Sequence, residues 1–282
     1  MDGKTLPALA PPRPAYRGLR MLSGLVVVVL VLYAALLGAV WWGQERLIFH
    51  PETLPQDHDF GLPADIHETW LDVPGARLNA LHLRLPHPDG VVFFLHGNAG
   101  NLASWFVNAD FYRRANFDLY MVDFRGYGRS SGHIDSEAQL HADVRAAWDA
   151  VAPLYAGKKR VIYGRSLGTA LAAVLAAEVQ PELTILVSPY TSMTDLAREH
   201  YRWVPTALLR YPLRTDLALA RVHGPLVLAH GGRDTLIAPA HSRRLQAVAP
   251  QAQLLLVPEA GHGDIQEFPA YLDGLAAALA GR

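Results

Sequence analysis

The stretch that decides the fold is Arg160–Thr169, which reads RVIYGRSLGT. Its first four residues form a short, mostly apolar run typical of a buried strand, and the residues from Ser166 to Val179 have a helical pattern. The G-x-S-x-G motif Gly164–Gly168 lies between them. A tight strand-to-helix turn exposes the serine hydroxyl, and glycines flank it because side chains would clash there. The motif therefore predicts Ser166 as a nucleophile, and the alternative is a serine in an ordinary glycine-rich turn.

Strand-like and helix-like segments alternate on both sides of this motif. Residues 67–73 and 78–83 alternate apolar and polar side chains, which suits antiparallel edge strands. Continuous apolar runs expected of strands buried on both faces lie at 91–95, 117–122, 160–163, 183–187, 226–229 and 254–257. Further helical patterns lie at 136–152, 239–248 and 268–280, the first opening with a Ser136…Gln139 capping-box spacing. We predict an α/β fold over residues 66–282, with a mostly parallel eight-stranded sheet and helices on both faces.

The partners of a nucleophilic serine should follow it in the order acid, then histidine, at the carboxyl ends of later strands. Asp234 lies just past the run at 226–229, and His262 lies just past the last run at 254–257. We predict that His262 is the general base and that Asp234 fixes its tautomer. Asp264 is the competing acid, but it is too close to His262 in the chain to face its other ring nitrogen easily.

The loop after residues 91–95, His96–Asn101, is placed to supply an oxyanion-hole amide. We assign that amide to Asn98, with Ala99 as the alternative, and the second amide to Leu167, which follows the nucleophile. His96 is interpreted as a structural residue bonded within its loop, although it could be read as a base. Asp123 is interpreted as a turn residue rather than as an acid or a metal ligand.

Composition excludes several classes of protein. Of the 282 residues, 51% are hydrophobic and 18% are charged, which supports a substantial core. The formal net charge of −1 leaves no basic stripe for nucleic acid. The chain has no cysteine, so disulfides and thiol nucleophiles are excluded, and no histidine or carboxylate group has metal-site spacing. We expect no metal and no cofactor.

The run Met21–Trp42 contains no charge and predicts a transmembrane helix. Its 22 residues would span about 33 Å, and Trp41 and Trp42 suit an interfacial aromatic belt. A cleavable signal peptide is the alternative, but its apolar core is usually shorter. Basic residues concentrate before the run, which predicts a cytoplasmic tail over 1–20 and a catalytic domain outside, periplasmic in a bacterium. These residues are Lys4, Arg13, Arg17 and Arg20. Residues 43–65 read as an extended connector.

Six motifs together resemble the α/β hydrolases and, more narrowly, the membrane-anchored Bem46-type hydrolases. They are LIFHP (47–51), FLHGNAGN (94–101), DFRGYGRSSG (123–132), YGRSLG (163–168), HGGRDTLI (230–237) and GHGD (261–264). The resemblance implies an α/β-hydrolase fold and acyl transfer through Ser166, His262 and Asp234. Such enzymes act as esterases, lipid hydrolases, palmitoyl thioesterases or serine peptidases, so the mechanism is better defined than the substrate. Gly263 departs from the asparagine more often expected there, which affects only loop detail.

Residues 189–224 form a connection too long for a simple loop and rich in aromatic and leucine residues. They include Tyr190, Tyr201, Trp203, Leu208, Leu209 and Tyr211. The segment is either a helical cap over Ser166 that sets specificity or a structural helix pair packed on the sheet. We predict hydrolysis of an ester or related acyl bond, with an acyl lipid as one candidate substrate. A serine peptidase and a non-catalytic membrane-tethered binding protein are the competing classes.

Overall fold

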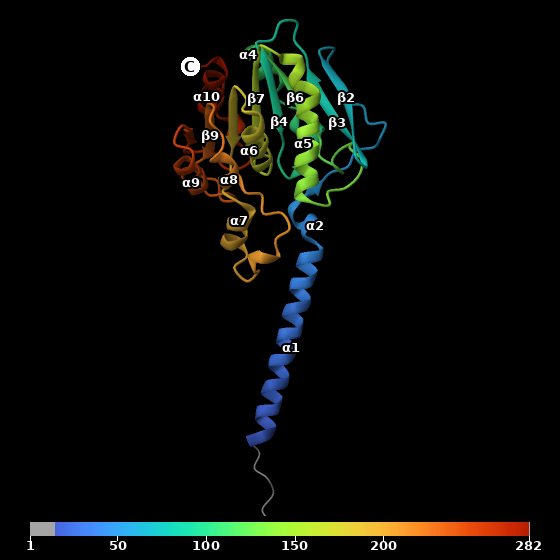
Figure 1. Ribbon diagram of the computed structural model, residues 1–282, viewed down its shortest axis with the longest axis vertical. Helices are drawn as coiled ribbons and strands as arrows, with labels where there is room; N and C mark the ends of the chain where they lie inside the picture. The colour runs from blue at the N-terminus through green and yellow to red at the C-terminus, as the bar shows by residue number, and fades with distance from the viewer. Residues whose placement is uncertain (1–14, 282) are drawn as a thin grey trace, which may run out of the picture. The chain divides into compact units, whose positions relative to one another are not determined.

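The computed structural model describes residues 15–281 and their side chains from residue 18 onward. The chain divides between Gly43 and Gln44 into two units. The first contains helix α1 (Ala15–Trp42), and the second contains every other helix and strand (Figure 1).

Helix α1 is long and apolar enough to cross a bilayer. The stretch Gly18–Trp42 has 25 residues, and an 18-residue window within it has a mean hydropathy of 2.6. A signal sequence near an N-terminus would pass the same test. Of the predicted tail 1–20, residues 15–20 already belong to the helix, since alanine, leucine and arginine favour helix. Residues 1–14 lie outside the described part of the chain.

The second unit is built on an eight-stranded sheet, as predicted. The strands are β2 (Ile66–Val73), β3 (Ala76–Leu83), β4 (Gly90–Leu95), β6 (Phe117–Val122), β7 (Lys159–Arg165), β8 (Leu183–Val187), β9 (Leu226–Gly231) and β10 (Gln253–Val257). Their order is β10-β9-β8-β7-β4-β6-β3-β2. Strand β3 pairs antiparallel with β2 and β6, and all other neighbours are parallel. Strands β4 and β6 are buried throughout, which explains their unbroken apolar sequences.

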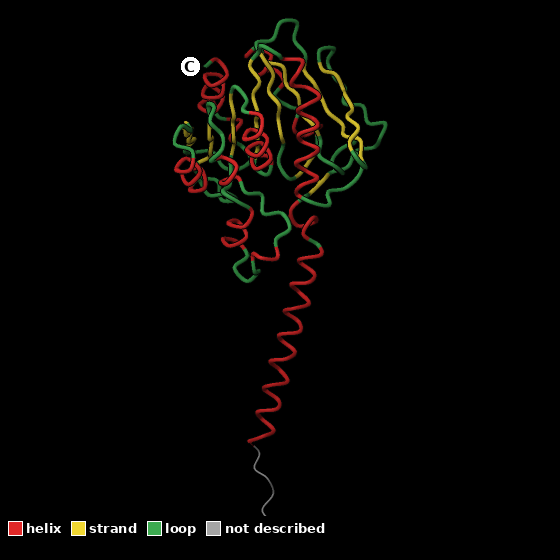
Figure 2. The backbone as a smooth tube through the Cα atoms, in the orientation of Figure 1, coloured by secondary structure: helices red, strands yellow, loops and turns green. Residues whose placement is uncertain are grey.

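Helices cover both faces of this sheet (Figures 1 and 2). One core layer packs α5 (Glu137–Val151), α6 (Gly168–Val179), α8 (Thr215–Leu219) and α9 (Ala240–Val248) against the sheet. The opposite layer packs α3 (Leu102–Trp105), α4 (Ala109–Ala115) and α10 (Pro269–Ala280). The carboxyl ends of the parallel strands therefore remain available for functional loops.

The start of α5 contains half of the predicted capping box. The Ser136 hydroxyl accepts a hydrogen bond from the Gln139 amide at 3.1 Å. The Gln139 side chain accepts from the amide of Asp135, rather than from that of Ser136. The two side chains therefore satisfy backbone N–H groups at the start of α5, as in a capping box. The Gln139 side chain, however, binds the amide one residue before the expected one.

The segment predicted as an extended connector carries short elements that pack on the domain. Helix α2 (Gln44–Ile48) is followed by β1 (His50–Pro51), which pairs in parallel with β5 (Ala99–Gly100). Between them, Phe49 is buried and meets the Tyr211 ring edge-on at a centroid distance of 5.2 Å. Burial of this aromatic ring fixes the segment in place, which its polar composition did not indicate.

The predicted cap segment, residues 189–224, is partly core. It contains α7 (Met193–His200), the 3₁₀ turn η2 (Thr206–Leu208) and α8. Tyr190 and Tyr211 are fully buried and belong to the core beneath α6 and α8. Tyr201 and Trp203 lie on the surface instead. The two ends of the segment are thus structural, because they pack in the core. Only the residues around η2 remain candidates for a cap.

A buried histidine should make folding stability depend on pH. Burial, and then the positive charges of Arg84 and His67, lower the pKa of His82 to about 4 from 6.5. As the pH falls from 6.5 to 4 the unfolded chain binds the proton and the folded chain does not, so stability should fall by roughly 3 kcal/mol. Urea unfolding between pH 7 and pH 4 measures this.

The matched variant is His82→Gln, which retains an amide able to reach the Tyr155 hydroxyl, 2.7 Å from His82 Nε2. Its stability should decline less steeply over the same range. Equal slopes for the two proteins would contradict the assignment to His82.

Candidate active site

Ser166 occupies a strained turn between β7 and α6. Its φ angle is 49°, in the left-handed region that residues with a side chain rarely adopt. The Ser166 amide donates to the Val187 carbonyl at 2.9 Å, and the Thr169 hydroxyl donates to the Ser166 carbonyl at 2.6 Å. The neighbouring strand and helix thus both fix this conformation, and Ser166 is only 7% exposed, whereas the motif predicted an exposed hydroxyl.

The two glycines of the motif are required by close backbone packing. A Cβ on Gly164 would lie 2.6 Å from the Gly168 carbonyl oxygen and 2.7 Å from the Ala172 Cβ. A Cβ on Gly168 would lie 2.2 Å from the Leu95 carbonyl oxygen. All three distances are far below van der Waals contact, as the sequence interpretation required.

The structure brings the three predicted residues of the hydrolytic site together. The Nε2 atom of His262 lies 3.1 Å from the Ser166 Oγ, and its Nδ1 atom lies 2.8 Å from the Asp234 Oδ2. Asp234 follows β9, and His262 follows the neighbouring strand β10. If Nδ1–H donates to the carboxylate, Nε2 is left to accept the serine proton.

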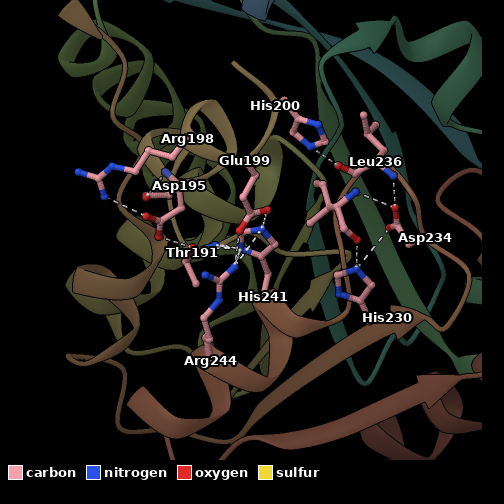
Figure 3. A network of polar contacts seen from close by, with 12 residues as sticks. Thr191, Asp195, Arg198, Glu199, His200, His230, Asp234, Leu236, His241 and Arg244 are labelled. Atoms are coloured by element: carbon pink, nitrogen blue, oxygen red, sulfur yellow. Dashed lines mark hydrogen bonds and ion pairs between the residues drawn. The ribbon is translucent and has the colours of Figure 1, made fainter. Parts of the chain in front are cut away.

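The Asp234 carboxylate is buried within a set of donors (Figure 3). Its Oδ1 accepts from the amides of Leu236 at 3.0 Å and Ile237 at 2.8 Å. His230 Nε2 lies 3.3 Å from Oδ2. Burial by itself would raise the pKa of Asp234, but hydrogen bonds from His230, His262 and the Ile237 amide outweigh it and hold the pKa well below its usual range. The carboxylate therefore stays ionised.

Asp264, the competing acid, has a different partner. Its Oδ1 accepts from the Gly261 amide at 2.7 Å and so closes the loop that carries His262. No hydrogen bond joins it to the His262 ring among the contacts of residues 15–281. The proximity argument from the sequence and the geometry thus favour the same acid, Asp234.

Two segments that could form an oxyanion hole adjoin Ser166. The Gly97 position lies beside the nucleophile, since a Cβ there would be 3.7 Å from the Ser166 Cβ. Within the described chain, no hydrogen bond acceptor contacts the amide N–H of Asn98 or of Leu167. Both amides are therefore free of acceptors within the described chain and able to bind a developing oxyanion.

The connector holds Asn98 in place. The carbonyl of Asn98 accepts from the His50 amide and from the Tyr127 hydroxyl, both at 2.8 Å. Its side chain donates to the carbonyl of Ile48 at 3.2 Å. Sequence reasoning missed this role for residues 48–51, although the LIFHP motif was a signal that the segment matters.

His96 and Asp123 are structural, as interpreted from the sequence. His96 Nδ1 donates to the Gly97 carbonyl at 2.7 Å, and its Nε2 lies 3.4 Å from Asp123 Oδ1. The other Asp123 oxygen accepts from the Leu102 amide at 3.3 Å. Both side chains are buried, and their contacts shape the loop rather than reach Ser166. In the described chain, no three His, Asp or Glu residues gather as metal ligands.

Arg165 is a site residue that the sequence interpretation missed. Its buried guanidinium donates through Nη2 to the carbonyl of His262 and through Nη1 to the Ser188 hydroxyl at 3.3 Å. The residue before the nucleophile thus ties the turn to the loop of the base. No local sequence pattern signals the contact with His262, because Arg165 and His262 are 97 residues apart.

Comparison with known proteins identifies the family. The sequence model for the family described as serine aminopeptidase, S33, matches residues 86–218. Human alpha/beta hydrolase domain-containing protein 17B is 30% identical over 211 residues, covering 71% of this chain and 70% of that protein. The chain belongs to the α/β hydrolase superfamily.

Two further comparisons extend this result. The α/β hydrolase is 31% identical over 260 residues to an uncharacterized protein of Mycobacterium tuberculosis strain H37Rv, covering 88% of this chain and 89% of that one. The structure of an esterase from Pyrococcus furiosus superposes with a TM-score of 0.64 at 18% identity, covering 83% of this chain and 97% of that chain. The latter likeness concerns the fold alone, and the Bem46-type assignment remains a narrower prediction.

Proposed function

We propose that this α/β hydrolase is a membrane-anchored serine hydrolase that cleaves an ester or related acyl bond through Ser166, His262 and Asp234. The observation that carries the proposal is the continuous hydrogen-bond chain of 3.1 Å and 2.8 Å from the serine through the histidine to the aspartate. Its supports are the strained serine turn and the two unoccupied amides beside it.

The proposed reaction follows from that chain. His262 Nε2 takes the Ser166 proton while Oγ attacks the carbonyl carbon, and the amides of Asn98 and Leu167 hold the oxyanion. His262 then protonates the leaving group, leaving an acyl enzyme. Water, deprotonated by His262, releases the acid and restores the serine. Asp234 stabilises the imidazolium in both steps.

An ester is the preferred substrate class, and an acyl lipid is our first candidate within it. The similar solved fold of an esterase and the apolar helix that would tether the domain to a bilayer support this choice. A serine peptidase with the same three residues is the second candidate, because the matching family model is described as an aminopeptidase. Turnover of aminoacyl amides without turnover of esters would favour the peptidase.

Membrane anchoring by α1 is part of the proposal, with the second unit outside the cytoplasm. Its supports are the 25-residue apolar stretch and the basic residues before it. In a bacterial host, protease added to spheroplasts should digest the domain that begins at Gln44. Full protection, with digestion only after lysis, would reverse the orientation.

The first test is covalent labelling with a fluorophosphonate probe, which phosphonylates activated serines. The full-length protein should be labelled on the peptide that contains Ser166, and Ser166→Ala should not be labelled. Heat-denatured protein is the control for nonspecific reaction. Absence of labelling in the folded protein would favour the non-catalytic binding protein over the hydrolase.

A further inference from the structure

A short segment of the predicted cap presents aromatic side chains to solvent. We call residues 201–210 the docking segment. Tyr201 is 57% exposed and Trp203 is 46% exposed, and Arg202 between them is exposed too. Neighbouring exposed aromatic side chains are unusual on a soluble surface, and they mark places where the surface meets another apolar or interfacial phase.

The far end of this segment is fastened to the chain that leaves α1. Gln44 is buried, and its side-chain amide donates to the Leu208 carbonyl at 2.7 Å and accepts from the Arg210 amide at 2.9 Å. Glu45 accepts from the Tyr211 hydroxyl at 2.8 Å and pairs with the Arg210 guanidinium at 2.7 Å. Four contacts thus hold residues 208–211 to the first two residues of the second unit.

Covalent connectivity limits how far the docking segment can be from the end of α1. Gln44 follows Trp42 by two residues, and a chain advances at most about 3.6 Å per residue. Adding one glutamine side chain leaves Leu208 within about 15 Å of Trp42, whatever the orientation of the domain. Two successive turns, closed by Val204 N to Tyr201 O and Leu208 N to Pro205 O, keep the segment compact. A bilayer headgroup layer is itself about 6 Å deep.

The chemistry of the segment suits a lipid surface. Tyrosine and tryptophan prefer the headgroup level, where the ring is buried and the polar group stays wet. Arg198 and Arg210 pair with Asp195 and Glu45, whereas Arg202 forms no ion pair within residues 15–281. A cation beside two exposed rings favours an anionic bilayer over an apolar protein surface.

We propose that the docking segment binds the surface of the bilayer that holds α1, with Tyr201 and Trp203 at headgroup depth. This inference rests on the membrane anchoring proposed above. It makes the segment a second membrane contact, which sets how the domain is oriented on the lipid surface.

The other end of the segment leads to the site (Figure 3). His200 Nε2 donates to the Leu236 carbonyl at 3.2 Å, and the Leu236 amide donates to Asp234. Glu199 binds His241 and Arg244 of α9. A docked segment is therefore linked through His200 and Leu236 to the loop that carries Asp234.

The cysteine-free chain permits a direct test with single cysteines in the full-length protein. Tyr201→Cys, Leu154→Cys and Leu30→Cys would each carry an environment-sensitive fluorophore. Leu154, 61% exposed, lies in the 3₁₀ turn η1 (Ala152–Tyr155) at the amino end of β7, opposite the site. Leu30 lies within α1. The proteins would be placed in nanodiscs of phosphatidylcholine and phosphatidylglycerol, with and without nitroxide-labelled lipid.

We expect blue-shifted emission and nitroxide quenching at positions 201 and 30, with neither at 154. Adding Arg202→Gln to the Tyr201→Cys protein should reduce the shift in phosphatidylglycerol discs more than in pure phosphatidylcholine discs. Quenching at 30 but not at 201 would overturn docking and leave the anchor intact. No quenching at 30 would overturn both. A shift at 201 that followed protein concentration and ignored nitroxide lipid would assign the surface to a second copy and overturn lipid docking.

Discussion

Replacing Asp234 with asparagine should lower kcat by about 10⁴-fold. Serine proteases lose about this much when the aspartate of their Ser-His-Asp triad is replaced by asparagine. The amide keeps an oxygen for the Leu236 and Ile237 amides, so the loop should hold its shape. It cannot stabilise an imidazolium, and its N–H group favours the wrong tautomer of His262. Ser166→Ala should cost still more, about 10⁶-fold. Steady-state kinetics on a soluble short-chain ester measures both.

Asp264→Asn is the matched control, because its oxygen accepts only a backbone amide, from Gly261. An asparagine oxygen can accept the same bond, so kcat should fall little. If Asp264→Asn lost activity by orders of magnitude and Asp234→Asn did not, the two carboxylates would exchange roles. A larger KM with an unchanged kcat in Asp234→Asn would also contradict the proposed mechanism.

Replacing Gly168 with alanine should destabilise the domain by about 3 kcal/mol and abolish serine labelling. The new Cβ would lie 2.2 Å from the Leu95 carbonyl oxygen and 2.6 Å from the His96 carbonyl oxygen. Both are backbone atoms, so strand β4 and the start of α6 must separate. That shift would move Ser166 relative to the loop that holds Asn98. Urea unfolding and fluorophosphonate labelling would report the two effects.

Gly263→Ala provides the comparison within the same site. No atom lies within 4 Å of the Cβ that it would add, so stability should be unchanged. Gly263→Asn, which introduces the residue more often expected beside the histidine, should be tolerated for the same reason. Equal stability of Gly168→Ala and Gly263→Ala would show that the turn between β7 and α6 can adjust more than its close contacts indicate.

The central strands could be predicted because a strand buried on both faces has an unbroken run of apolar residues in the sequence. Phe117–Val122 and Leu183–Val187 coincide with β6 and β8, and each is buried along its whole length. The residues that follow such a strand can likewise be read directly from the sequence. For that reason Ser166, Asp234 and His262 could be placed in one site before any contact was known.

What escaped prediction depends on contacts between distant residues. Helices α2 and α4 have 5 and 7 residues, too few for a clear period. The sequence does not show that Phe49 is buried, because its partner Tyr211 lies far away in the chain. Arg165 binds the carbonyl of His262, and the His50 amide binds the carbonyl of Asn98. No sequence spacing rule relates the chain segments that these bonds join.

The pairing of β1 with β5 limits where the domain can be cut free of its helix. A cut at Gly43 leaves Gln44–Pro51 on the domain, together with the hydrogen bonds to Asn98. A cut beyond Pro51 removes them. Shedding at the first position should release an active soluble enzyme, whereas trimming past the second should release an inactive one. The shortest soluble form that keeps both bonds to Asn98 therefore starts no later than Ile48.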